Sequence, residues 1–341
     1  MRFASTCPDR RVAQRRALCL AVVAACALGT PWRAAPAAQE PVGTAGSSSV
    51  FRSGTDLVVL QVSVADTRQK FVTGLGVEDF AVFEEGVSQR VALFASGTVP
   101  LDVLLLLDTS SSMAGRLGLA QEAAVTLVGA LRPDDRAGII LFHDRVEIAH
   151  QLSTDRAAAV QSIRAARPGG ATALHESIYI GLRELERVRR GGELMRRQAM
   201  VVLSDGADNR SHLAGDEVLD AARRSAVTIF TIVPTPRDEV VVAPWTAGDG
   251  TGVFEMRRLA SDTGGRHFTP AGFEDLATIY RDIGSELGEQ YWLAYAPSPP
   301  SPPGFRRVWV RVANRPDLHT RTRSGYFASA PRRPPPPRAK P

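Results

Sequence analysis

The 341-residue sequence predicts a doubly wound α/β fold that is flanked on both sides by β-rich segments. Three observations support this fold class. A near-continuous apolar run at 101–107 is typical of a strand that is buried on both faces of a parallel sheet. Strand-like and helix-like segments then alternate up to residue 289, as in a sheet with right-handed crossovers. The segments 51–98 and 290–328 contain short strand-like runs separated by turns instead.

The first β segment, 51–98, opens with a β-branched run at 57–64. A polar turn follows it, and then a short apolar pair at 71–72. Further strand-like runs at 79–83 and 90–94 are separated by Glu84-Glu85-Gly86, which is a turn signal. This close spacing of short strands predicts an all-β structure.

The middle segment, 99–289, carries the alternating pattern of the α/β domain. Apolar residues at helical spacing predict its helices, and short β-branched runs predict its strands. We expect helices at 117–131, 156–166, 173–188, 216–225, 254–261 and 273–287, and strands at 138–142, 199–203 and 227–233.

The last β segment, 290–328, contains strand-like runs at 291–297 and 306–312 and a short piece near 325–327. Neither β segment is large enough to bury its own apolar faces. We therefore expect 51–98 and 290–328 to pair into one small β-sandwich, with the α/β domain inserted between them. Residues 329–341 form a Pro/Arg-rich tail, which we expect to be disordered.

The N-terminus predicts export. Residues 1–38 combine an arginine-rich start, about 12 apolar residues and an Ala-Pro-Ala-Ala cleavage site, which is typical of a signal peptide. The apolar stretch is too short to span a bilayer, so we expect no transmembrane helix in the mature chain. Residues 39–50 are small and polar, and they indicate a flexible leader. A periplasmic or secreted protein follows, and a lipoprotein anchored at Cys26 is the alternative.

Charge and cysteine content exclude several classes of function. The formal net charge is +5. Residues 1–38 alone carry six arginines and one aspartate, so the remainder has no net charge and no general attraction for nucleic acid. All three cysteines lie in the predicted signal peptide, which excludes thiol chemistry from a mature chain: Cys7, Cys19 and Cys26.

Oxygen-bearing side chains gather where three strands or loops end. The buried run at 101–107 leads into Asp108-Thr109-Ser110-Ser111-Ser112, and ligands bind at this carboxyl edge in open α/β sheets. Thr172 precedes a predicted helix, and Asp205 follows the predicted strand at 199–203. Two carboxylates and three hydroxyls are hard donors that suit Mg²⁺ or Mn²⁺, and Ca²⁺ less well.

These residues resemble a known site. DTSSS at 108–112, the threonine of GGATAL at 169–174 and the aspartate of LSDGADN at 203–209 are similar to the metal-ion-dependent adhesion site of von Willebrand factor type A (VWFA) domains, whose fold is Rossmann-like. The resemblance implies that Ser110 and Ser112 bind the metal directly, that Asp108 and Asp205 act directly or through water, and that Thr172 joins in one conformational state. Ala171 departs from relatives in which glycine directly precedes the threonine.

The flanking segments resemble a narrower bacterial group. LVVLQVSVADTRQKFVTGLGVEDFAVFEEGVSQRVALF at 57–94 and EQYWLAYAPS at 289–298 are similar to the VWFA-related family described from acidobacteria. This resemblance refines the expected architecture more than the mechanism.

The resulting interpretation is a non-enzymatic binding protein that uses a divalent cation for protein–protein interaction or cell adhesion, with a partner that supplies an acidic side chain. One alternative is a structural envelope module in which the metal only stabilises loops. Another is a serine hydrolase with Ser112 or Ser204 as nucleophile, although no GxSxG motif occurs. His175 either orients the site or packs at a helix N-terminus. The sequence does not specify the oligomeric state.

Overall fold

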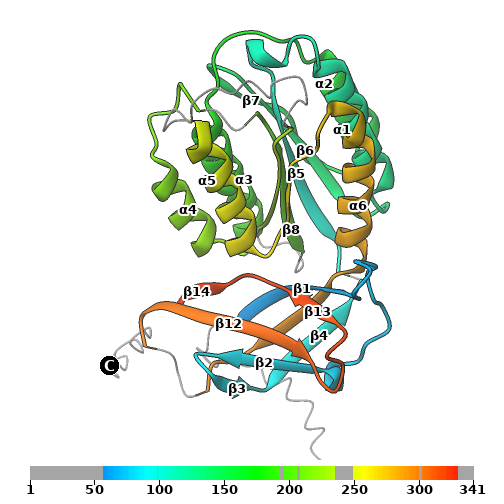
Figure 1. The fold of residues 1–341 in the computed structure, drawn as a ribbon, viewed down its shortest axis with the longest axis vertical. Coiled ribbons are helices and arrows are strands. Elements are labelled where there is room, and N and C mark those ends of the chain that lie inside the picture. The colour runs from blue at the N-terminus through cyan, green and yellow to red at the C-terminus, as the bar shows by residue number, and fades with distance from the viewer. Residues whose placement is uncertain are drawn as a thin grey trace, which may run out of the picture. The chain divides into compact units, whose positions relative to one another are not determined.

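A computed structural model describes residues 57–97, 99–191, 196–205, 208–234, 249–298 and 302–328 (Figure 1). The predicted signal peptide, flexible leader and C-terminal tail lie outside the described residues. Among the helices that the structure describes, none combines the length and apolarity needed to cross a membrane.

The α/β part contains a six-stranded sheet with the order β10-β9-β8-β5-β6-β7. All neighbouring strands in it are parallel except β6 and β7. The strands are β5 Leu101–Asp108, β6 Arg136–Phe142, β7 Val146–Ser153, β8 Arg197–Leu203, β9 Thr228–Ile232 and β10 His267–Phe268. The predicted doubly wound fold is confirmed, with the antiparallel edge strand β7 and the two-residue edge strand β10 as additions that the sequence did not indicate.

Helices cover both faces of this sheet (Figure 1). They are α1 Leu117–Ala130, α2 Arg156–Ala165, α3 Leu174–Arg190, α4 Gly215–Arg224, α5 Asp249–Thr263 and α6 Leu276–Glu289. Side chains alternate along β5. Val103 and Leu105 therefore pack with α1, α2 and α6, whereas Leu104 and Leu106 pack with α3, α4 and α5. This two-sided burial explains the continuous apolar run of the sequence.

The flanking segments form two antiparallel sheets, with the orders β13-β1-β11-β4 and β14-β12-β2-β3. Each sheet contains strands from both ends of the chain, and the two sheets share one hydrophobic core. The expected pairing into a small sandwich is therefore correct. The strands are β1 Val58–Ala65, β2 Phe80–Glu84, β3 Val87–Gln89, β4 Val91–Ser96, β11 Tyr291–Tyr295, β12 Gly304–Val312, β13 His319–Arg321 and β14 Gly325–Ala328.

Short elements and boundaries differ from the sequence expectation in places. The apolar pair at 71–72 contributes only an isolated bridge between Phe71 and Ala65. The helix expected at 254–261 extends over Asp249–Thr263. Single-turn 3₁₀ helices lie at Val77–Asp79, Ser111–Met113 and Phe273–Asp275.

Strand β7 pairs irregularly with β6. The register shifts twice, between Ala137 and Ile139 and again between Ile139 and Ile140. At the opposite edge, β10 contains only two residues. The six-stranded sheet thus ends in an irregular strand on one side and a very short strand on the other.

Helix α6 joins the α/β part to the sandwich, because β11 begins two residues after the helix ends. Glu286 on α6 is fully buried. It accepts a 2.8 Å hydrogen bond from the Ser63 hydroxyl of β1 and forms an ion pair with Arg321 of β13. A buried carboxylate needs such partners. The contacts of Glu286 with Ser63 and Arg321 therefore connect the end of α6 to the sandwich.

Candidate metal site

The candidate site lies at the carboxyl edge of the six-stranded sheet, where the loops after β5 and β8 and the loop before α3 meet. Asp108 is the last residue of β5, and Asp205 lies two residues beyond β8. Backbone hydrogen bonds connect the loop before α3 to the β5 loop: Ser111 N–H donates to the Gly170 carbonyl at 3.1 Å, and Gly169 N–H donates to the Thr109 carbonyl at 2.8 Å. The sheet thus brings together segments that are far apart in sequence.

Four of the five predicted residues form one connected set of hydrogen bonds. The Ser112 hydroxyl donates to Asp205 Oδ2 at 2.7 Å, and the Ser110 and Ser112 hydroxyl oxygens lie 2.9 Å apart. A hydroxyl has one proton, and that of Ser112 is used on Asp205, so Ser110 is the donor to Ser112. The Ser110 N–H donates to Asp108 Oδ1 at 2.8 Å. Both serine oxygens therefore keep lone pairs for a further ligand.

Asp108 is fully buried, and burial has the largest effect on the pKa of its carboxyl. Burial raises the pKa of the Asp108 carboxyl, hydrogen bonds from Ser110 and Ser204 lower it, and the charge of Asp205 raises it, with a net upward shift. The Ser204 hydroxyl donates to Asp108 Oδ2 at 2.7 Å. Two mutually repelling carboxylates in a partly desolvated position favour a cation near them.

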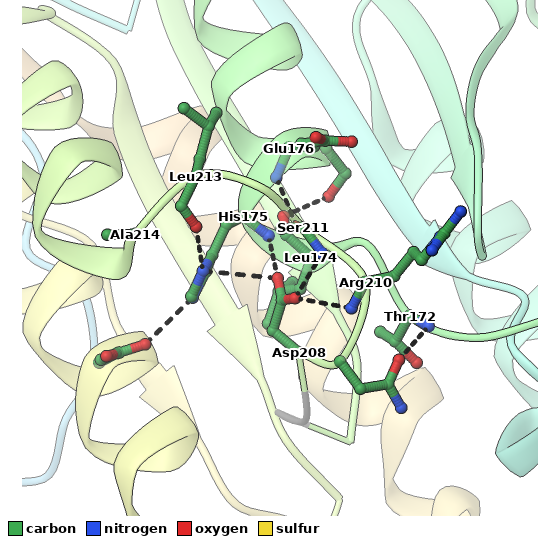
Figure 2. A network of polar contacts seen from close by, with 12 residues as sticks. Thr172, Leu174, His175, Glu176, Asp208, Arg210, Ser211, Leu213 and Ala214 are labelled. Atoms are coloured by element: carbon green, nitrogen blue, oxygen red, sulfur yellow. Dashed lines mark hydrogen bonds and ion pairs between the residues drawn. The ribbon is translucent and has the colours of Figure 1, made fainter.

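Thr172, the fifth predicted residue, is buried and is held through its backbone (Figure 2). Its N–H donates to Asn209 Oδ1 at 2.8 Å, and its carbonyl accepts from the N–H groups of Asn209 and Arg210 at 3.1 and 3.2 Å. The loop after β8 therefore fixes the position of Thr172, although Ala171 rather than glycine precedes it in this sequence.

Gly170, two residues before Thr172, has a conformation that requires glycine. Its φ is +78°, and a Cβ at this position would lie 2.3 Å from Asp144 Oδ1. Its carbonyl also receives the Ser111 N–H. The close approach of the two loops thus depends on this residue.

Asp208 closes the loop after β8 and caps α3 (Figure 2). Its Oδ2 accepts the His175 N–H at 2.7 Å, and its Oδ1 accepts the Ser211 N–H at 2.9 Å. Burial acts to raise the pKa of Asp208, but these hydrogen bonds and the neighbouring His175 outweigh it, so the pKa is lowered. Asp208 is thus a capping and loop-forming residue.

His175 lies beside Asp208 and links α3 to α5 (Figure 2). Its ring Nε2 is 3.1 Å from Glu255 Oε2, and its Nδ1 is 3.1 Å from the Leu213 carbonyl oxygen. Both ring nitrogens thus face acceptors outside the candidate ligand set. The structure favours helix N-terminal packing for His175 over direct orientation of the site.

Sequence reasoning missed two supporting residues, Ser204 and Asn209. Both belong to the LSDGADN segment that contains Asp205. The sequence presents Ser204 only as a candidate hydrolase nucleophile, whereas its hydroxyl is fully buried and donates to Asp108. The signal that could have found them is their position next to a predicted ligand at the end of a strand.

The donor set fits a hard divalent cation. Among the residues that the structure describes, no three His, Cys, Asp or Glu side chains gather into a metal site. A site here would consist of two carboxylates supplemented by hydroxyls, a combination that suits Mg²⁺ or Mn²⁺ rather than zinc.

The strand order defines a doubly wound α/β domain, a class of fold in which ligands bind at the carboxyl edge of the sheet. The family model described as von Willebrand factor type A domain matches residues 102–282, more than half of the chain. This chain belongs to the von Willebrand factor type A family.

Individual relatives are distant. The chain is 32% identical over 111 residues to the uncharacterized protein sll0103 of Synechocystis, covering 32% of this chain and 26% of that one. It is 24% identical over 208 residues to a UPF0353 protein of Mycobacterium leprae, covering 54% and 60%. The chain thus spans less than two thirds of the length of these relatives.

Solved structures with a similar fold include a von Willebrand factor type A protein from Catenulispora acidiphila, at 12% identity and a TM-score of 0.47, covering 82% of this chain and 75% of that one. The vWF domain of the type V pili tip protein Mfa5 from Porphyromonas gingivalis has 15% identity and a TM-score of 0.43, covering 55% and 95%. BatB from Bacteroides thetaiotaomicron has 17% identity and a TM-score of 0.42, covering 55% and 98%.

Proposed function

We propose that this chain is a non-enzymatic protein-binding module that works through a divalent cation, Mg²⁺ or Mn²⁺. The residues that would hold the ion are Asp108, Ser110, Ser112, Thr172 and Asp205. The observation that carries the proposal is the hydrogen-bonded series from Ser110 through Ser112 to Asp205, which lies beside the buried Asp108. Membership of a family of interaction modules supports a protein as the partner.

The two serine hydroxyls are oriented to act as neutral oxygen ligands. Each hydroxyl proton points along the series toward Asp205, which leaves the oxygen lone pairs available. Two carboxylates would balance the ion's charge, and neutral ligands would leave it able to attract a further anion. When bound, an octahedral ion supplies an open position that a partner's acidic side chain can occupy.

The loop contacts favour partner binding over a metal that only stabilises loops. The three loops are already connected by direct bonds, such as Ser111 to Gly170 and Thr172 to Asn209. An ion is therefore not needed to hold them together. The buried Asp108 carboxylate, by contrast, would have its charge balanced by a bound cation.

The hydroxyl environments also favour a non-enzymatic role. Ser112 and Ser204 each donate their proton to an aspartate, Asp205 and Asp108 respectively. A serine nucleophile instead donates to a base that removes the proton. We extend the proposal to an exported protein, periplasmic or secreted, on the strength of the N-terminal sequence, with lipidation at Cys26 as the alternative.

Metal titration tests the proposal most directly. Mg²⁺ and Mn²⁺ are added to wild type and to Asp108→Ala, and the melting temperature is followed. The wild type should gain stability with metal, by about 2.7 kcal/mol when the free ion is at about 100 times its Kd, and the variant should not. Equal responses of the two proteins at every metal concentration would overturn the metal site.

A pull-down from envelope extract, with and without chelator, tests the interaction. Partners should be retained in Mg²⁺ and lost in EDTA, and Asp108→Ala should behave as the chelated protein. Retention that ignores both chelator and variant would contradict a metal-bridged interaction and support the structural module. Labelling of the protein by a serine-reactive probe would support a hydrolase instead.

A further inference from the structure

A cavity of about 270 Å³ lies at the other end of the sheet from the candidate metal site. Asp102, which is one of its lining residues, lies at the start of β5, and Asp108 ends that strand. At about 3.3 Å per residue, the two positions are separated by roughly 20 Å. The cavity is therefore distinct from the metal site.

The sandwich and the α/β part both contribute walls to this cavity. Along β1, Leu60 and Val62 point into the sandwich core, so Val59 and Gln61 lie on the outer face of that sheet. Trp292 pairs with Gln61 across the neighbouring strand β11 and also lines the cavity. Further apolar surface comes from Val188 of α3 and from Ala226, which precedes β9.

The side-chain amide of Gln61 is held in a fixed orientation on the wall of this cavity. Its Nε2 donates to the carbonyl oxygens of Gln198 and Ala226 at 3.2 and 3.0 Å. These two acceptors fix the orientation of the amide, because a flipped amide would direct its oxygen at two carbonyls. Its Oε1 is buried and has no hydrogen-bond partner in the part of the chain that the structure describes. Because Oε1 is buried, it is not open to the cavity, and Gln61 contributes a wall whose orientation is fixed by the two carbonyls.

Arginines supply positive charge at the same cavity. Arg196 is mostly buried and is held by Asp102 Oδ1 at 2.6 Å and by the Leu101 and Asp134 carbonyls. Arg189 of α3 is exposed and also lines the cavity, and among the described residues no ion pair or hydrogen bond engages its guanidinium. A guanidinium in this position is suited to a planar carboxylate.

We infer that this cavity binds a small aromatic acid. Its carboxylate would pair with Arg189, and its ring would contact Trp292 and the valines. The volume lies just below the usual range for ligand pockets, which restricts the ligand to a small molecule.

Calorimetric titration of the full chain with 4-hydroxybenzoate tests this inference. Benzamidine carries a positive charge in place of the carboxylate and should show no binding. Comparable affinity for benzamidine, or no heat with 4-hydroxybenzoate, would overturn the inference.

Arg189→Gln tests the position of the charge. We expect affinity for 4-hydroxybenzoate to fall by roughly 1.5- to 5-fold, the range for an exposed ion pair. Arg183→Gln is the matched control, because Arg183 is an exposed arginine on the same helix that does not line the cavity. Equal affinities of the two variants would contradict the assignment. Because Arg189 is exposed, circular dichroism should show both variants folded.

The proposals about the cavity and about the metal site can be tested separately. Binding of 4-hydroxybenzoate should be the same in EDTA, in Mg²⁺ and in Asp108→Ala. If chelator abolished it, the acid would be binding at the metal site and the inference about the cavity would be wrong.

Discussion

The hydroxyl of Ser112 donates a 2.7 Å hydrogen bond to the carboxylate of Asp205, a residue 93 positions further along the chain. This contact connects the loops that follow the two adjacent parallel strands β5 and β8. Because the single proton of the Ser112 hydroxyl is used in this bond, the lone pairs of the Ser112 oxygen remain available to a further ligand.

Ser112→Ala should therefore weaken binding of Mg²⁺ and Mn²⁺ by about 10- to 100-fold, the range seen for residues that complete or orient a metal site. Isothermal titration calorimetry measures this effect. Ser111→Ala is the control, because Ser111 is the exposed neighbour and contributes to the loop contact through its backbone. Similar affinities in the two variants would argue against Ser112 as a ligand.

Gly170→Ala should destabilise the protein by about 1–3 kcal/mol, because alanine would adopt a positive φ and its Cβ would meet Asp144. The displaced loop should also weaken metal binding. Gly169→Ala is a close control, since a Cβ there meets nothing within 4 Å. Urea unfolding measures the stability of both variants. Equal unfolding midpoints would show that the positive φ at residue 170 does not require glycine.

Asp208→Ala should cost about 1–2 kcal/mol at pH 7, because it removes the acceptor for the first turn of α3 and for the loop after β8. The pKa of Asp208 is lowered by folding. Its stabilising effect is therefore present above the unfolded pKa of about 3.8 and is lost as the pH falls through the lower folded value.

The difference in stability between wild type and Asp208→Ala should accordingly shrink below about pH 3.8. Denaturant unfolding at pH 7, 5 and 3 measures it. A difference that stays constant down to pH 3 would mean that the charge of Asp208 does not contribute.

Residues 99–289 should fold when expressed alone, because both sheet faces are covered by helices from this segment. We expect a monomer with cooperative unfolding but lower stability than 51–328, since Glu286 loses Ser63 and Arg321. Size-exclusion chromatography and thermal unfolding provide the readout. An aggregate would indicate that the sandwich and the α/β part form one inseparable core.

The parts of this structure that depend on periodicity could be predicted from the sequence. The apolar run Leu101–Leu107 indicated a strand buried on both faces, and the helices followed from their apolar spacing. Strand β7 was missed because VEIAHQLS is half exposed and lacks clean alternation. It lies at the sheet edge, where one side of the strand needs no apolar partner.

Individual ligand candidates could be predicted because motif spacing places them at strand ends. Their supporting contacts could not. Asn209 holds Thr172 across 37 positions of sequence, and Gln61 reaches Gln198 across 137. Such pairings depend on how distant elements pack, and no local pattern encodes them.

The two edges of the six-stranded sheet have a consequence for behaviour at high concentration. A long, regular edge strand offers a row of unpaired amide groups on which another molecule can add a strand. Here one edge has only the two residues His267–Phe268, and at the other the twice-shifted register of β7 against β6 interrupts a regular row. The domain is thereby poorly suited to templating strand-by-strand polymerisation through this sheet.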